Sequence, residues 1–154
     1  MTLGAMTGWM SVYMGADLWT GVILAAMVGS LLGALHSMLT VSLGLSQHVT
    51  GIGITLLASS LSYYIYRLVL PEVTSPPRIE AFTNYPIPLL SEIPWIGEAL
   101  FNQSPLTYLA FILVIVVGLV LYRTPLGLSV RTTGENPSAV EAQGMNVILS
   151  LIHI

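Results

Sequence analysis

The hydrophobic pattern divides the chain into long apolar runs separated by short polar breaks. No Asp, Glu, Lys or Arg occurs from Leu18 to Tyr66. A membrane-spanning helix needs about 20 apolar residues, so this run is long enough for two spans. Its break falls at residues 44–51, "GLSQHVTG", where glycine and polar residues cluster. The pattern therefore predicts spans at about 18–43 and 49–69.

A third apolar run predicts a span at about 105–122. Pro105 suits the first turn of this helix, where a backbone N–H is not needed. Residues 71–104, which separate the second and third spans, are rich in proline. Proline in a helix interior removes a hydrogen bond and clashes with the preceding turn. We therefore expect a loop there rather than a continuous helix.

Arginines close to the span ends indicate an orientation. Arg123 and Arg131 follow the third span, and arginine near span ends favours the cytoplasmic side. This places residues 123–144 in the cytoplasm and the Pro-rich loop outside. The turn between the first two spans would also face the cytoplasm, and the N-terminus would lie outside. Two further arginines weigh against this orientation, Arg67 and Arg78.

Composition supports the same class of protein. Apolar residues make up 55% and charged residues 7%, whereas an average soluble domain is roughly a quarter charged. Cysteine is absent, which excludes disulfides and thiolate metal sites, and acids and histidines lack metal-site spacing. The net charge of −3 does not suggest a nucleic acid partner. No catalytic motif is present, so we expect a single all-α polytopic membrane domain over residues 1–154, with no enzymatic activity, cofactor or metal.

Small residues recur four apart along the first two spans. Residues with this spacing share one helix face, and small faces let helices approach closely in lipid. The first series is Gly21, Ala25, Gly29, Gly33 and Ser37, and the second is Gly51, Thr55 and Ser59. Helix packing, at Gly29, Gly33 and Gly51 above all, is one interpretation. A substrate path lined by the same face, including Thr55, is the other.

His36 lies in the middle of the first span, in "ALHSML". An ionisable residue within a span is a candidate for the substrate path, although a histidine can also bond a neighbouring helix. Asp17, at the start of that span, suits the N-terminus of a helix. His36 and Thr55 are therefore the candidate substrate-path residues.

The polar stretch "RTTGENPSAVEAQGM", residues 131–145, predicts a short helix at 137–143. Asn136 is a good N-cap, Pro137 a good first residue, and Gly144 suits the left-handed C-terminal position. An isolated helix this short is unstable in water, so a partner is one interpretation and an ordinary interfacial loop another. A short tether, "RTPLGLSVR", joins it to the third span. The apolar end of the chain after Gly144 resembles the first turns of another span, so we expect a fragment.

Two motifs resemble the permease subunits of bacterial ABC importers, in the branch for nucleosides and simple sugars. The T-x-x-G-L-x-x-R element of that family is matched by Thr124, Gly127, Leu128 and Arg131. Its G-E-N-P-x-A-A-x-x-x-G-I-x-V element is matched by Gly134, Glu135, Asn136, Pro137, Ala139, Gly144 and Val147. A turn that opens a span in the family is matched by Gln47, Val49, Thr50 and Gly51. Val140 and Met145 replace the usual Ala and Ile, and Thr55 stands where nucleoside-type members often have Asn.

The resemblance implies a transport permease of the bacterial inner membrane that moves nucleosides or simple sugars. It implies three kinds of protein partner: ATP-binding subunits, a second permease subunit or copy, and an extracytoplasmic substrate-binding protein. The segment 134–144 would be the coupling helix that docks on the ATP-binding subunit. The coupling residues would be Arg131, Gly134, Glu135, Asn136, Pro137, Ala139, Glu141 and Gly144. A secondary transporter or channel that works without ATP is the alternative.

Overall fold

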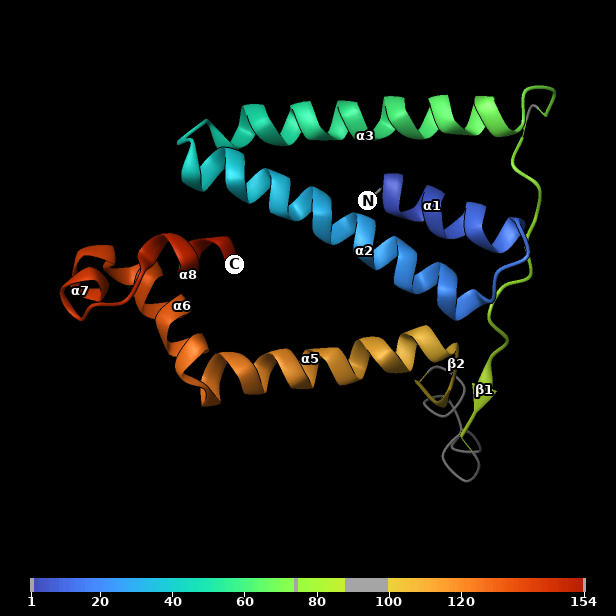
Figure 1. The fold of residues 1–154 in the computed structure, drawn as a ribbon. Coiled ribbons are helices and arrows are strands. Elements are labelled where there is room, and N and C mark those ends of the chain that lie inside the picture. The colour runs from blue at the N-terminus through green and yellow to red at the C-terminus, as the bar shows by residue number, and fades with distance from the viewer. Residues whose placement is uncertain (1, 74, 88–99, 154) are drawn as a thin grey trace. The chain divides into compact units, whose positions relative to one another are not determined.

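The structure, a computed structural model, describes residues 2–73, 75–87 and 100–153 (Figure 1). Helix α2 (Leu18–Ser37) continues as a π-helical turn, η1 (Met38–Ser42), and α3 (Gln47–Val69) follows. Helix α5 covers Pro105–Arg123. These are the three helices of the described residues that are long and apolar enough to cross a membrane. The predicted all-α polytopic membrane fold is therefore confirmed.

The remaining elements are short. Helix α1 (Thr2–Tyr13) precedes the first span, and α6 (Pro125–Glu135), α7 (Pro137–Ala142) and α8 (Val147–His153) follow the third. Strands β1 (Tyr85–Pro86) and β2 (Asn102–Gln103) form an antiparallel pair. The chain divides into two compact units, one built on α1, α2 and α3 and the other on α5, α6 and α7.

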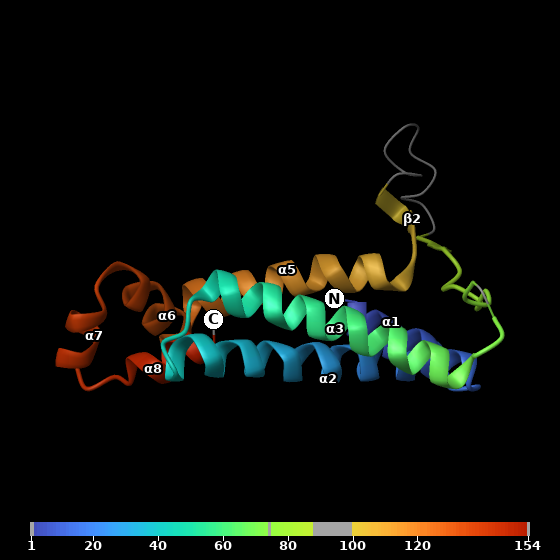
Figure 2. The ribbon, with the colours of Figure 1, turned by 90° about the horizontal axis from the view of Figure 1, so that it is seen from above.

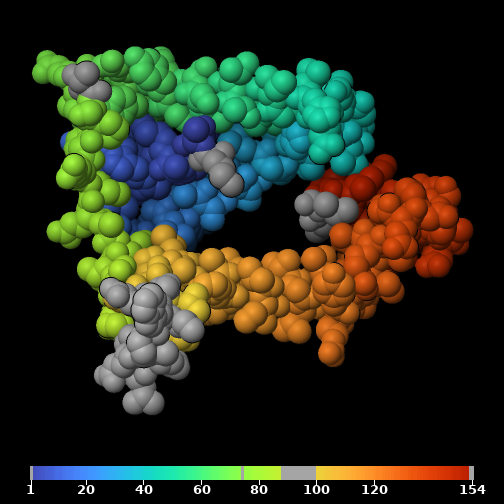
Figure 3. Space-filling view, turned by 180° about the vertical axis from the view of Figure 1, so that it is seen from behind, coloured from blue at the N-terminus to red at the C-terminus, as the bar shows by residue number. Residues whose placement is uncertain are grey.

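In the first unit, α1 lies between α2 and α3 at the end away from their connecting turn (Figures 1 and 2). A Cβ placed on Gly8 would lie 3.0 Å from the carbonyl oxygen of Gly21, and one on Gly4 would lie 3.0 Å from that of Ala25. The small residues therefore allow close packing of α1 on the first half of α2. Figure 3 shows the surface of α1 (dark blue) filling the space between the two longer helices.

The second half of the predicted small-residue series is packed less closely among the described residues. A Cβ on Gly29 or Gly33 would meet no atom within 4 Å, whereas one on Gly51 would lie 3.9 Å from the ring of His36. The packing role of Gly29 and Gly33 therefore remains a prediction. The spans also leave most of their apolar side chains exposed, with 6% or less of each apolar window buried. In a membrane, lipid or further helices would cover these faces.

Trp9 ties the segment after α3 to the first unit. Its indole N–H donates to the carbonyl of Pro77 at 3.1 Å. Its ring stacks on Tyr13 at 5.4 Å between centroids and lies 6.1 Å from the ring of Tyr66. The Tyr66 hydroxyl donates to the carbonyl of Val73 at 3.2 Å. Aromatic side chains with one polar atom suit a membrane–water interface, so this cluster marks one end of the helices.

The Pro-rich loop is anchored at the start of α5. The Tyr108 hydroxyl donates to the carbonyl of Tyr85 at 3.0 Å and accepts from the backbone N–H of Gln103 at 3.2 Å. One side chain thus joins β1, β2 and the third span. The middle of the predicted loop, residues 88–99, lies outside the described residues.

Helix boundaries differ slightly from those predicted. Helix α3 begins at Gln47 rather than 49, and α5 ends at Arg123 rather than 122. A larger difference concerns the predicted tether, because residues 125–135 form the 11-residue helix α6. Pro125 takes the first turn and Thr124 caps it, so the proline begins a helix there instead of breaking one.

Candidate functional site

The candidate coupling site begins at the corner where α5 ends and α6 begins. Thr124 is the C-cap of α5 and the N-cap of α6, with extended backbone angles. Its hydroxyl donates to the carbonyl of Val120 at 2.6 Å and accepts from the backbone N–H of Gly127 at 3.2 Å. A capping hydroxyl satisfies a backbone N–H that the first helical turn leaves without a partner. One side chain therefore ends the span and starts the next helix.

Gly127 permits the tightness of this corner. It is buried, and a Cβ placed on it would overlap the backbone of Val120 and Leu121. The carbonyl oxygens of both residues lie within the space that a methyl group would need. Any other residue would push α6 away from the end of α5.

Arg131 also holds the corner. Its guanidinium lies 4.9 Å from the centroid of the Tyr122 ring, a cation–π geometry. Arg131 was predicted as a coupling residue, and here it joins α6 to the end of the span. Three residues of the T-x-x-G-L-x-x-R element thus stabilise the corner. Its threonine caps α6, its glycine allows α6 to approach the end of α5 closely, and its arginine lies over the Tyr122 ring.

Helix α7 has the predicted caps. The side-chain oxygen of Asn136 accepts from the backbone N–H of Ala139 at 3.2 Å, and Pro137 is the first helical residue. Gly144 has φ +78°, a left-handed conformation that favours glycine. Backbone bonds from Gly144 to the carbonyl of Glu141 (2.9 Å) and from Met145 to that of Val140 (3.2 Å) complete a Schellman ending. Both ends of this short helix are therefore specified by its own residues.

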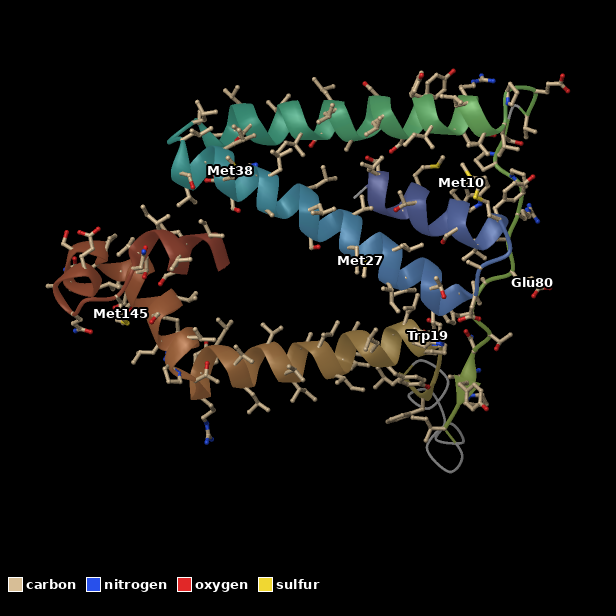
Figure 4. All side chains as sticks on the ribbon, viewed as in Figure 1. Met10, Trp19, Met27, Met38, Glu80 and Met145 are labelled. Carbon is tan, nitrogen blue, oxygen red and sulfur yellow. The ribbon has the colours of Figure 1, made fainter. Side chains whose placement is uncertain are left out.

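Packing against α6 stabilises α7. Val140 and Thr133 are each 2% exposed, so both side chains are fully buried. The Thr133 hydroxyl donates to the carbonyl of Ser129 at 2.7 Å, so the buried polar atom is satisfied. The Ser129 hydroxyl donates to the sulfur of Met145 at 3.0 Å; Met145 is labelled in Figure 4. These contacts join α6, α7 and the turn after α7 into one body.

The other predicted coupling residues lie on the surface of this body. All residues between 134 and 144 except Val140 are exposed, which leaves the following available to a partner: Gly134, Glu135, Pro137, Ala139, Glu141 and Gly144. A Cβ on Gly134 would meet no atom within 4 Å, so the fold itself does not need a glycine there. Thr133 and Val140 are thus buried inside the α6–α7 body, whereas these predicted coupling residues are exposed on its surface.

The predicted substrate-path residues lie together in a second place, in the first unit. His36 of α2 and Thr55 of α3 line one open groove of about 550 Å³ beside the α2–α3 turn. Its other lining residues all come from α3: Gln47, His48, Gly51, Ile52 and Leu56. Sequence reasoning did not single out Gln47 for this groove. Its spacing of four and eight residues before Gly51 and Thr55 was a usable signal.

No group of three or more potential metal-ligating side chains occurs in the described part of the chain. The described residues form a helical membrane scaffold with an exposed helical body after α5 and a groove beside the α2–α3 turn. These features define a polytopic helical membrane protein as the class of protein.

The chain belongs to the family described as "Branched-chain amino acid transport system / permease component", whose model matches residues 1–149. It is therefore a multi-pass protein of the cytoplasmic membrane and a transport component rather than an enzyme. No solved structure matches it significantly.

Named relatives are also permeases. The chain is 33% identical to the nucleoside ABC transporter permease protein NupC of Lactococcus lactis, over 94% of this chain and 42% of that protein. It is 30% identical to the guanosine ABC transporter permease protein NupQ of Bacillus subtilis, over 96% and 48%. It is 31% identical to the putative glucose ABC transporter permease protein TsgC13 of Haloferax volcanii, over 96% and 44%. The chain spans less than half the length of these relatives.

Proposed function

We propose that the full-length protein is the permease subunit of an ATP-driven importer for nucleosides or simple sugars. The observation that carries this proposal is the α6–α7 body. It is rigidly joined to a membrane span, capped at both ends of α7, and exposes polar residues to a partner. The names of the relatives support the same function, since they include nucleoside, guanosine and glucose permeases.

In this mechanism α7 is the coupling helix, which docks on an ATP-binding subunit in the cytoplasm. Closure of two such subunits on ATP would move α7, and the α5–α6 corner would transmit that movement to the third span. Glu135 and Glu141 would offer charge to the partner, while Ala139 would allow close approach. A substrate-binding protein would deliver the solute from outside, and a second permease subunit or copy would complete the path.

The proposed substrate path runs beside His36 and Thr55. Both side chains line the groove between α2 and α3, at the end of these helices near their turn. The arginine distribution supports a cytoplasmic position for that turn. A substrate leaving the membrane region on the inner side would then pass this groove.

A single cysteine tests the coupling role, because the sequence contains none. Ser138 is exposed on α7, so we would introduce Ser138→Cys and attempt disulfide crosslinking to cysteine-bearing ATP-binding subunits in native membranes. The expected result is a crosslink whose yield changes with ATP. Free labelling of the introduced thiol by a water-soluble reagent, with no crosslink, would favour a transporter or channel that works without ATP.

A further inference from the structure

We propose that the groove beside the α2–α3 turn recognises an uncharged nitrogen heterocycle, such as the base of a nucleoside, and that Gln47 reads its hydrogen-bonding edge. This inference rests on the proposed importer function and specifies its substrate class. The groove volume of about 550 Å³ falls within the roughly 300–1,000 Å³ of small-molecule sites.

The lining divides into two parallel stripes on α3. Gln47, Gly51 and Thr55 are four residues apart and share one face. The neighbouring stripe is His48, Ile52 and Leu56. A flat ring with apolar faces and polar edges matches this combination, because one stripe offers hydrogen-bonding groups and the other mainly apolar surface.

Gly51 lies where α3 faces the ring of His36. A Cβ at that position would be in ordinary van der Waals contact with this ring, at 3.9 Å, so the imidazole from α2 lies close to the glycine. Ile52 and Leu56 supply the apolar part of the lining. The half-buried imidazole of His36 forms the opposite wall.

Polar atoms remain available at the groove's edge. Thr55 donates its hydroxyl proton to the carbonyl of Gly51 at 2.8 Å, which leaves its oxygen able to accept. The amide of Gln47 can both donate and accept, as required by an edge that alternates donors and acceptors. No Asp, Glu, Lys or Arg occurs from Leu18 to Tyr66, so the groove provides no carboxylate, ammonium or guanidinium for an ionic ligand. A nucleotide phosphate would therefore find no strong cation there.

The backbone after His36 ends α2 in a π-helical turn. The π-helical turn η1 begins two residues after His36, at Met38 (Figure 4), and the backbone N–H of Leu43 donates to the carbonyl of Met38 at 3.2 Å. Thr40 donates its hydroxyl to the carbonyl of His36 at 2.8 Å. This turn ends α2 just beyond the residue that α2 contributes to the groove.

The main test uses the full-length protein, co-reconstituted with its ATP-binding subunits and binding protein in proteoliposomes. Uptake of tritiated adenosine, guanosine and glucose would be measured for the unmodified protein and for Gln47→Leu and Gln47→Glu. Gln47→Leu should raise the KM for both nucleosides roughly tenfold, the effect of losing about one hydrogen bond, with little change in kcat. Ser60→Leu, on the opposite face of α3, is the matched control and should leave the KM unchanged.

The Gln47→Glu variant distinguishes recognition from structural damage. A carboxylate only accepts hydrogen bonds, whereas an amide does both. Guanine presents two adjacent donors on one edge, while adenine presents a donor beside an acceptor. The ratio of the KM for adenosine to that for guanosine should therefore rise in Gln47→Glu. An unchanged ratio, an unchanged KM in Gln47→Leu, or uptake of glucose without nucleosides would overturn the inference and leave the importer function standing.

A binding measurement covers the case in which reconstituted transport fails. Thr55→Cys, in a cysteine-free version of the full-length complex, would be labelled with a membrane-permeable maleimide. Guanosine should slow the labelling several-fold, and guanosine monophosphate and glucose should not. Equal labelling rates with and without both nucleosides would overturn the base site. Failure of the Ser138→Cys crosslink would instead count against the coupling role, so the two failures are distinguishable.

Discussion

Thr124 and Gly127 together form the corner between the third span and α6. The Thr124 hydroxyl accepts from the backbone N–H of Gly127 at 3.2 Å, and Gly127 lies against the carbonyls of Val120 and Leu121. In the proposed mechanism, movement of α7 reaches the span only if this corner stays rigid. Its rigidity comes from one capping hydroxyl, one missing side chain and the Arg131–Tyr122 contact.

Replacing Gly127 tests the corner. Gly127→Ala places a methyl group where the backbone of α5 already lies, so the corner must open. Overpacking of this kind costs about 1–3 kcal/mol. We expect a lower melting temperature of the detergent-solubilised protein and a loss of uptake. Gly118→Ala, at a helix glycine with open space around it, should not lower the melting temperature and should keep uptake; equal losses in the two variants would contradict the proposed corner.

The Asn136 cap leads to a second prediction. Asn136→Ala removes the acceptor for the Ala139 backbone N–H and should destabilise α7 by about 1 kcal/mol. Asn136→Asp keeps an acceptor oxygen and should behave as the unmodified protein does. The measurement is ATP-dependent uptake by each variant at equal membrane expression. Equal loss in both variants would show that the amide contacts a partner and does more than cap the helix.

Packing of α7 on α6 gives a third prediction. Val140→Ala removes two methyl groups from a fully buried side chain of the body, a change worth about 1.6 kcal/mol at 0.8 kcal/mol per methylene. We expect α7 to detach more often, which limited proteolysis after reconstitution would detect as faster cleavage between 134 and 145. Val114→Ala makes the same chemical change at a side chain that is 72% exposed. Cleavage at the unmodified rate in Val140→Ala would mean that other contacts hold α7.

Local signals predicted the parts of the fold that local chemistry controls. Asp17 accepts from the backbone N–H of Trp19 at 3.0 Å and caps α2 as expected, and the caps of α7 are confirmed. Each of these features depends on residues within a few positions of one another. The apolar runs likewise predicted the three long helices, because a span depends mainly on length and composition.

Features that depend on distant contacts were missed or misread. Val140 was noted only as a departure from a family pattern, yet its side chain is buried in the body in which α7 packs on α6. The stretch "RTPLGLSVR" was interpreted as a tether, but Pro125 begins a helix there because Thr124 caps it. The π-helical turn after His36 has no local sequence signal that we recognise. Gln47 joins the groove only because α2 and α3 meet at their turn.

The last prediction concerns the exposed end of α6. It distinguishes residues that this chain requires for folding from residues that it requires for docking of a partner. Gly134 has open space around it and lies within a helix, so Gly134→Ala should stabilise α6 by about 0.5–1 kcal/mol. Glu135 is exposed, so Glu135→Arg should leave folding unchanged and reverse a charge that the partner meets. If α7 and the end of α6 dock on the ATP-binding subunit, both variants should insert normally and hydrolyse more ATP per solute imported. The ratio of phosphate released to solute taken up in proteoliposomes measures this directly.

Glu80→Arg, a charge reversal at an exposed residue of the Pro-rich loop, is the matched control and should keep the ratio of the unmodified protein. An unmodified ratio in all three variants would place the docking surface elsewhere, because a buried partner interface does not accept a reversed charge without cost.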